Sequence, residues 1–290
     1  MQNELKKQAT VQIPLGRLLR FPGHPYKVED NEEMEALAES IREYGILNPL
    51  LVRRMEGSET DYELISGHRR AYAAAKAGLE TVPAFAVSLD RNEAAIALVD
   101  SNLHREQLLP SEKAFAYKLK MEAMKRQGRR TDLTSCQLGT KLRTDNQIAE
   151  TADESARQIQ RYIRLTNLIP ALLDQMDEGR IAFSVGVELS YLPYEAQADL
   201  LDAMERNDCT PSYAQAVRLH RAYNVGTLDR WLIETTLAEP KPNQQEHIRL
   251  KREAFAKFFP EHYTAAQIEQ DIQAGLELLR RQRDRSRDAR

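Results

Sequence analysis

The sequence predicts an α+β N-terminal domain that is followed by an all-α region. Between residues 31 and 103, helical patterns alternate with short runs rich in Leu, Val and Ile that are typical of strands. From Ser111 onward, hydrophobic residues recur almost only at helical spacing. With 290 residues, 42% of them hydrophobic, the chain can bury two or three cores. We therefore expect domains at residues 1–110, 111–210 and 211–290.

Cysteine usage and hydropathy limit the class of protein. Cys136 and Cys209 are far apart and belong to no CxxC pair, which predicts reduced thiols and neither a disulfide nor a zinc site. No apolar run approaches the roughly 18 residues that a membrane-spanning helix needs. The N-terminus is polar and does not resemble a targeting signal. These features predict a soluble cytoplasmic protein.

The net charge of −3 conceals an uneven distribution of charge along the chain. Residues 1–112 contain 13 Lys and Arg against 18 Asp and Glu, whereas residues 113–164 contain 12 against 6. A basic segment of this kind suggests a surface that binds a polyanion such as nucleic acid. The alternative is a solvated helix face, which the charge pattern alone does not exclude.

The elements of the first part follow from local signals. Asn31 as an N-cap and Gly45 as a terminator delimit the first helix, and Gly57-Ser58 forms a turn between two strands. The expected order is helix 32–44, strands 47–55 and 62–65, a short helix ending at Gly78, strand 81–89 and helix 92–103.

A glycine followed by His68, Arg69 and Arg70 begins the short helix, in the sequence ISGHRRAYAAAKAG. Free backbone N–H groups and the helix dipole attract an anion at this position, and Gly67 lets the anion approach the backbone. Two guanidinium groups would add bidentate contacts to phosphate oxygens. The alternative is that both arginines face solvent or pair with acids such as Glu63.

A second candidate site lies in DSNLHREQLLPSEKA, residues 100–114. On a helix, Asn102 and Glu106 are separated by four residues and share a face, so their oxygens could hold Mg²⁺ together with water molecules. Arg105 adds a charge suited to phosphate. An ordinary solvated helix surface explains the same pair without a metal.

The basic segment contains a helix-turn-helix pattern in DNQIAETADESARQIQRYIRL, residues 145–165. Ile148 and Ala149 would face inward from a first helix, and Asp153 would cap a second helix. The outward side chains of the second helix can reach base edges or phosphates, although an ordinary helical hairpin remains the alternative. These predicted DNA-binding residues are Ser155, Arg157, Gln158, Gln160 and Arg161.

The remaining helices are indicated by spacing, with prolines at their first turns. Residues 128–145 show no sustained period and predict a loop or a weak helix. The expected helices of this region are 112–127, 146–151, 153–165, 170–177, 184–191, 193–206, 247–258 and 264–283.

Together these segments resemble the ParB-like partition proteins over residues 10–205. GHRRAYAAAKAG is similar to the Gly-Glu-Arg-Arg box of that family, and NLHREQLLPSEKAFAY to its Asn-x-x-Arg-Glu box. NPLLVRR before the first box and the helix-turn-helix after the second fit the same order. The resemblance implies a sulfiredoxin-like N-terminal domain that binds CTP with Mg²⁺, and a helical domain that binds a palindromic centromere-like site on double-stranded DNA.

The resemblance also implies roles for particular residues. Those expected around the nucleotide are Gly67, His68, Arg69, Arg70 and Arg105, with His24 and Lys27 from the HPYK segment that occupies the place of a Gln-Pro-Arg segment. Asn102 and Glu106 would hold Mg²⁺. His68 and Ser101 both stand where the family usually has glutamate. The glutamate that Ser101 replaces is tied to hydrolysis in that family. We therefore expect CTP binding with weak or absent hydrolysis.

The function implied is that of a CTP-controlled DNA clamp in chromosome or plasmid segregation, with a mobile-element type favoured by the divergent C-terminal third. Such a protein would be a nucleoid-associated homodimer that works with a ParA-type ATPase. A transcriptional regulator or nucleoid occlusion factor on the same scaffold is an alternative. A sulfiredoxin-like phosphoryl-transfer enzyme or nuclease is another.

The last predicted helix has an apolar stripe that could pair with a second copy of the chain. Burial of the stripe inside the same chain is the alternative. The stripe contains Ile268, Ile272, Gly275, Leu276, Leu278 and Leu279.

Overall fold

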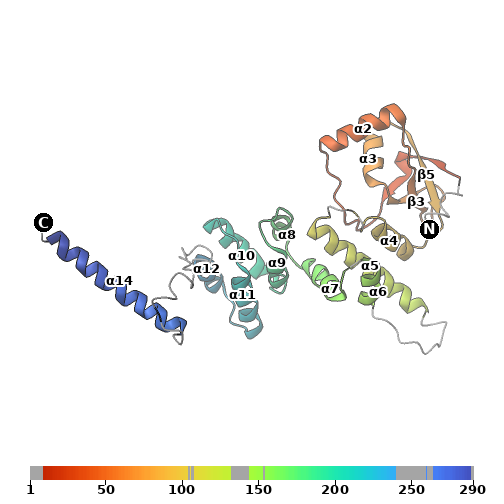
Figure 1. Ribbon diagram of the computed structural model, residues 1–290. Coiled ribbons are helices and arrows are strands. Elements are labelled where there is room, and N and C mark those ends of the chain that lie inside the picture. Colours follow the sequence, from red (N-terminus) through yellow and green to blue (C-terminus); the bar gives the residue numbers. More distant parts are fainter. Residues whose placement is uncertain are drawn as a thin grey trace. The chain divides into compact units, whose positions relative to one another are not determined.

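The computed structural model describes residues 9–103, 105, 108–131, 144–152, 154–239, 259 and 264–288. The chain divides into two compact units, residues 1–239 and residues 240–290, which are considered separately below (Figure 1). The predicted α+β domain followed by helical regions is confirmed. The predicted boundary at residue 110, within the first unit, stays a prediction.

A five-stranded mixed sheet forms the centre of the N-terminal part. Its strand order is β1-β5-β3-β4-β2; β1 and β5 pair antiparallel, β5 and β3 parallel, β3 and β4 antiparallel, and β4 and β2 parallel. The sequence predicted the three inner strands but neither edge strand, because each edge strand has only three or four residues. The strands are β1 (Val11–Pro14), β2 (Leu18–Arg20), β3 (Leu50–Arg54), β4 (Tyr62–Ser66) and β5 (Thr81–Val87).

Helices cover both faces of this sheet. Leu64 and Ile65 are adjacent in β4 and point to opposite faces, as alternation along a strand requires. Leu64 packs with α2 (Glu32–Tyr44) and α3 (His68–Lys76), whereas Ile65 packs with α4 (Arg91–Asp100) and α5 (Pro110–Thr131). The end of β4 and the start of α3 therefore lie between two hydrophobic cores.

Capping residues delimit these helices, and of these Asn31 and Gly45 were predicted from the sequence. Asn31 accepts a hydrogen bond from the Met34 N–H at the start of α2, and Gly45 ends that helix. Asp90 and Glu93 form a capping box at the start of α4, which fixes where this helix leaves the sheet.

The rest of the first unit is helical, as predicted. The sequence analysis did not identify the last two helices of this unit, although Ser212 and Gln215 form a capping box that marks the start of the first of them. The helices are α6 (Thr144–Ala152), α7 (Ala156–Leu165), α8 (Pro170–Asp177), α9 (Phe183–Leu189), α10 (Tyr194–Asn207), α11 (Tyr213–Val225) and α12 (Arg230–Ala238).

Helices α6 and α7 form the predicted helical pair, with one correction. Ile148 of α6 and Ile159 of α7 are fully buried against Tyr117 of α5, as expected for the inner faces of the pair. The expectation that Asp153 caps the second helix is wrong, because Ser155 is the N-cap of α7 and accepts from the Gln158 N–H. Serine fits this position because its short hydroxyl reaches the free N–H groups of the first turn.

The second unit contains α14 (Ala265–Asp288). The predicted helix 247–258 lies outside the described residues. Within the stripe, Leu276, Leu278 and Leu279 are each more than half exposed. Its role in dimer formation stays a prediction.

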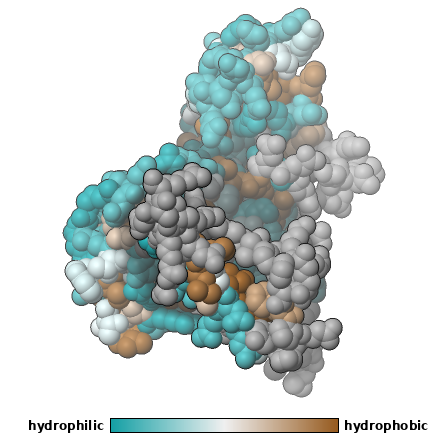
Figure 2. All heavy atoms as spheres, turned by 60° about the vertical axis from the view of Figure 1, so that its left-hand side comes forward, coloured by the Kyte–Doolittle hydropathy of each residue, from teal (hydrophilic) through white to brown (hydrophobic). Residues whose placement is uncertain are grey.

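Hydrophilic residues cover most of the non-grey surface in Figure 2. The mean hydropathy of −0.59 agrees with this distribution. No described helix is long and apolar enough to span a membrane.

Candidate nucleotide-binding and DNA-binding sites

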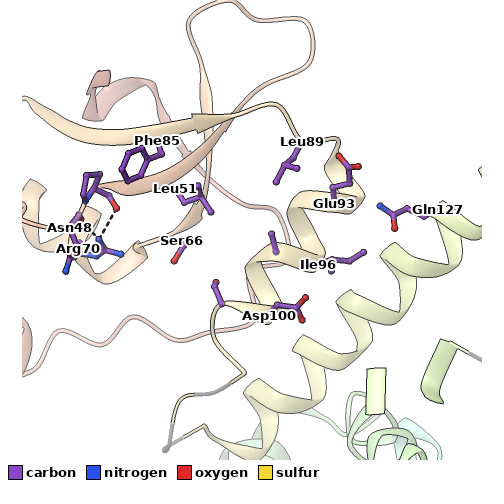
Figure 3. A pocket seen from close by; sticks show the side chains of 13 residues that line it. Asn48, Leu51, Ser66, Arg70, Phe85, Leu89, Glu93, Ile96, Asp100 and Gln127 are labelled. Carbon is purple, nitrogen blue, oxygen red and sulfur yellow. Dashed lines mark hydrogen bonds between the residues drawn. The ribbon is translucent and has the colours of Figure 1, made fainter. Parts of the chain in front are cut away.

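A cavity of about 980 Å³ lies between the sheet and helices α3, α4 and α5 (Figure 3). Arg70 of α3 is on one side of this cavity, and Glu93 and Asp100 of α4 are on the other. Apolar side chains form the wall between these charged groups. The lining residues are Asn48, Pro49, Leu51, Ser66, Arg70, Phe85, Leu89, Glu93, Ile96, Ala97, Asp100, Ser101 and Gln127.

The start of α3 combines a strained glycine with a fixed arginine. Gly67 has a φ of +101°, and a Cβ at this position would lie 2.5 Å from Leu50 Cδ2. Glycine is therefore required by both backbone conformation and space. The Arg70 guanidinium donates to the backbone carbonyls of Asn48 and Pro49, which holds it at the edge of the cavity.

Two histidines lie together beside this helix start. The rings of His24 and His68 are tilted by 40°, with centroids 3.6 Å apart. Arg20 donates to His24 Nδ1 at 3.3 Å, and the Arg105 guanidinium lies 5.8 Å from the ring centre of Tyr26. His68 Nε2 is buried without a hydrogen-bond partner in the described part of the chain.

Burial and the positive charges in this region disfavour the protonated forms of its titratable groups. Burial, followed by the positive charge of Arg20, lowers the pKa of His24 to about 4. Burial, His24 and the neighbouring arginines lower the pKa of His68 to about 3. Burial and then Arg105 also lower the pKa of the Arg70 guanidinium. An anion placed among these groups would stabilise their charged forms.

Arg69 and Lys27 point to other partners than the predicted ones. Arg69 lies beside Arg70 in the sequence but pairs with Glu33 of α2 at 2.9 Å, on the surface. Lys27 Nζ contacts Asp174 and Asp177 of α8, at 3.2 and 3.3 Å. Glu63, the acid considered as an alternative partner for the arginines, instead forms a buried pair with Arg53 at 2.6 Å.

Asn102 is buried just after α4. Its Nδ2 donates to Leu98 O and Ser101 Oγ, which leaves the amide oxygen as the atom able to face a cation. Glu106, its predicted partner, lies outside the described residues. Among the described residues there is no group of three or more His, Cys, Asp or Glu able to hold a metal ion. A hard cation beside Asn102 would therefore keep water or phosphate oxygens as ligands.

Lys120 connects the cavity wall to the helix-turn-helix. Its side chain is 3% exposed, and its ammonium lies 2.6 Å from Asp100 Oδ1 and 2.8 Å from Thr151 Oγ1. Asp100 lines the cavity, and Thr151 belongs to the last turn of α6. One buried cation thus contacts groups from both candidate sites.

The predicted DNA-binding residues divide into two groups. Ser155 is occupied as the helix cap, and Gln160 donates to Asp145 Oδ2 of α6. Arg157 is exposed, and the Arg161 guanidinium lies 4.9 Å from the ring centre of Phe183 and donates to Gln158 Oε1. The structure places the two arginines on one face of α7, as their spacing of four residues requires.

Sequence reasoning missed several residues of these sites. Arg20 is part of the short edge strand β2, so no strand pattern drew attention to it. Phe85 and Glu93 come from different elements and meet only at the cavity. The run NPLLVRR was the one local signal for this wall, since it supplies Asn48, Pro49 and Leu51.

Residues 1–103 match the family model described as the ParB N-terminal domain. The resemblance to ParB-like partition proteins indicated by the motifs is thereby confirmed. The chain is 35% identical over 172 residues to the chromosome-partitioning protein Spo0J of Thermus thermophilus. That match covers 59% of this chain and 56% of the relative, so the chain spans just over half of that relative's length.

Two solved structures of chromosome-partitioning ParB from Caulobacter crescentus, both C-terminally truncated, are also similar to this chain. The complex with the centromeric parS site is 23% identical, covering 79% of this chain and 98% of that chain with a TM-score of 0.42. The complex with CTP-γ-S is 27% identical, covering 66% of this chain and 96% of that chain with a TM-score of 0.32.

Proposed function

We propose that this chain is a sequence-specific DNA-binding partition protein whose hold on DNA is controlled by CTP. The observation that carries the proposal is the presence, in one compact unit, of a cavity bordered by Arg70 and a helix pair that presents Arg157 and Arg161. The sequence relationship to Spo0J supports the assignment to chromosome or plasmid partition.

The cavity suits a nucleoside triphosphate in chemical terms. Leu51, Phe85, Leu89 and Ile96 offer apolar surfaces for a base, and the carboxylates of Glu93 and Asp100 can accept hydrogen bonds from ribose hydroxyls. The phosphates would extend toward the N-terminus of α3, where the backbone N–H groups of the first turn have no acceptor within the helix.

The neighbouring cations would hold the phosphates. Two backbone carbonyls anchor Arg70. Its guanidinium therefore needs little reorganisation to bind one of the phosphates. Arg20 and Arg105 lie around the His24–His68 pair and would contact the others. Asn102 and Glu106 would hold Mg²⁺, whose charge would reduce repulsion between the phosphates.

The helical part would read double-stranded DNA. Helix α7 would enter the major groove as the recognition helix, with Arg157 and Arg161 near base edges or phosphates. Two copies of the chain would read a palindrome, with α14 as the candidate dimer contact. We further propose that the dimer closes around DNA as a clamp when CTP binds. It would recruit a ParA-type ATPase and act on the nucleoid.

Calorimetry with CTP, ATP, GTP and UTP in the presence of Mg²⁺ tests the nucleotide site. We expect selective CTP binding that Arg70→Ala abolishes and that Arg42→Ala, at an exposed position of α2, leaves unchanged. Binding of CTP by Arg70→Ala as tight as by the wild type would contradict the phosphate assignment. Preference for ATP would favour an enzyme.

Selection of DNA fragments from a random pool tests the DNA site. We expect an inverted repeat, lost in Arg157→Ala and Arg161→Ala while CTP binding persists. If the DNA contacts involve about six phosphates, log affinity should fall with log salt at a slope near −5. Mapping the sites in cells then separates partition, with sites near an origin or partition locus, from regulation of promoters.

A further inference from the structure

A second pocket, of about 350 Å³, lies beside α7. Arg157, Arg161 and Arg164 line it from one face of the helix, at spacings of four and three residues. Arg164 is not among the DNA-binding residues predicted from the sequence. The full lining is Arg157, Gln160, Arg161, Arg164, Val187, Glu188 and Tyr191.

Arg164 is held by a stack of rings. Its guanidinium lies 4.0 Å from the ring centre of Tyr191. Tyr191 stacks in turn on His220 of α11, with centroids 4.1 Å apart and an angle of 11° between the rings. Cation–π contact and ring stacking restrict both side chains, so three elements that are distant in sequence fix the position of one guanidinium.

The acid of this pocket is already engaged. Glu188 Oε2 lies 2.7 Å from Nδ1 of His220, the residue on which Tyr191 stacks. No described carboxylate lies within ion-pair distance of Arg157, Arg161 or Arg164. Arg164 Nε is buried and has no hydrogen-bond partner in the described part of the chain. The pocket therefore presents three guanidinium groups and a donor without an acceptor.

We propose that this pocket binds one phosphate of the DNA backbone, with Arg164 as its central ligand and Tyr191, His220 and Glu188 as positioning residues. The inference rests on the proposed DNA binding by α7. Recognition helices contact base edges mainly with their N-terminal residues, and Arg164 lies in the last turn of α7, where the backbone passes. A guanidinium can bind a phosphate through two parallel hydrogen bonds. This contact would set the register of α7 in the groove.

Fluorescence anisotropy with specific and random duplexes over a range of salt concentrations tests the proposal. We expect Arg164→Ala to weaken binding to both duplexes by the same factor, roughly tenfold. The slope of log affinity against log salt should become shallower by about one, because one phosphate contact is lost. Arg180→Ala, an exposed arginine after α8, is the matched control and should change neither quantity.

The stack provides a second arm of the test. Tyr191→Phe retains the ring and should bind DNA like the wild type. Tyr191→Ala should lose nearly as much DNA affinity as Arg164→Ala. His220→Leu would leave the Glu188 carboxylate without its partner beside the pocket, and should also weaken binding to both duplexes. Circular dichroism and thermal melts verify that each variant is folded.

Two results would overturn the inference: an unchanged salt slope in folded Arg164→Ala, or a loss confined to the specific duplex, which would indicate base reading. If the wild-type chain binds neither duplex, the proposed DNA-binding function itself fails. That result is distinct from failure of the phosphate pocket, which requires a wild type that binds.

Discussion

The ring centroids of His24 and His68 lie 3.6 Å apart, beside the N-terminus of α3. His68 follows Gly67 in the first turn of α3, while His24 comes from the loop after β2. Burial and the neighbouring cations lower both pKa values, to about 4 and about 3. The pair is therefore neutral at physiological pH. Two predictions concern its titration.

The first prediction is a dependence of stability on pH. The pKa of histidine in an unfolded chain is about 6.5, above both folded values. As the pH falls from 6.5 toward 4, the unfolded chain takes up protons that the native chain does not bind, and stability decreases. In urea unfolding at pH 7, 6 and 5, the free energy of unfolding should depend less steeply on pH in His68→Gln than in the wild type. Parallel curves for the two proteins would contradict the pKa assignment.

The second prediction is proton uptake when the nucleotide binds. A triphosphate beside His24 and His68 would raise both pKa values, so nucleotide binding should tighten as the pH falls toward them, from 6 to 5. Calorimetry in two buffers of different ionisation enthalpy measures the protons taken up. Uptake should decrease in His24→Gln, provided that this variant still binds CTP. An identical binding enthalpy in both buffers would exclude the coupling.

The third prediction concerns the space at Gly67. Gly67→Ala forces a left-handed backbone on alanine and places its Cβ against Leu50 Cδ2, so we expect a loss of about 1–3 kcal/mol in the free energy of unfolding. Gly57→Ala is a matched control, because Gly57 has a φ of +84° but no atom within 4 Å of the added Cβ. Urea unfolding should show the larger loss for Gly67→Ala. Equal losses would mean that the contact with Leu50 is relieved at no cost.

The fourth prediction concerns Lys120, which contacts both Asp100 and Thr151. Lys120→Met fills similar volume without the charge, and replacing a buried ionic contact in this way is often close to neutral for stability. We expect the variant to bind CTP and DNA separately but to lose most of the effect of CTP on DNA affinity. Lys125→Met, at an exposed position of the same helix, is the control. If CTP still changes the DNA affinity of Lys120→Met as much as that of the wild type, Lys120 does not couple the two sites.

The fifth prediction separates capping from DNA contact at Ser155. Ser155→Ala should lower the free energy of unfolding by about 1 kcal/mol, because the Gln158 N–H loses its acceptor. Ser155→Asp retains the cap and should restore stability, yet its negative charge should weaken DNA binding. Chemical unfolding and anisotropy measured on both variants test this. Stability unaffected by Ser155→Ala would rule out the capping role.

Several features were already determined by the sequence. The caps Asn31 and Ser212, and Gly67 before α3, act within one helical turn, and the spacing of apolar residues is a local property. The start of α3 and the pair α6–α7 could therefore be predicted from neighbouring residues alone. The edge strand β1 could not, because its pairing with β5 joins residues about 70 positions apart.

Only the tertiary structure decided what the charged side chains contact. Arg69 and Arg70 are equivalent in the sequence, yet the turn of α3 directs one to Glu33 and the other to the carbonyls beside the cavity. Lys27 contacts α8, and Arg164 is held by Tyr191 and His220. The partners in these contacts come from elements that are distant along the chain. Local propensity carries no information on such pairs, because the packing of helices against the sheet and against one another determines which of them meet.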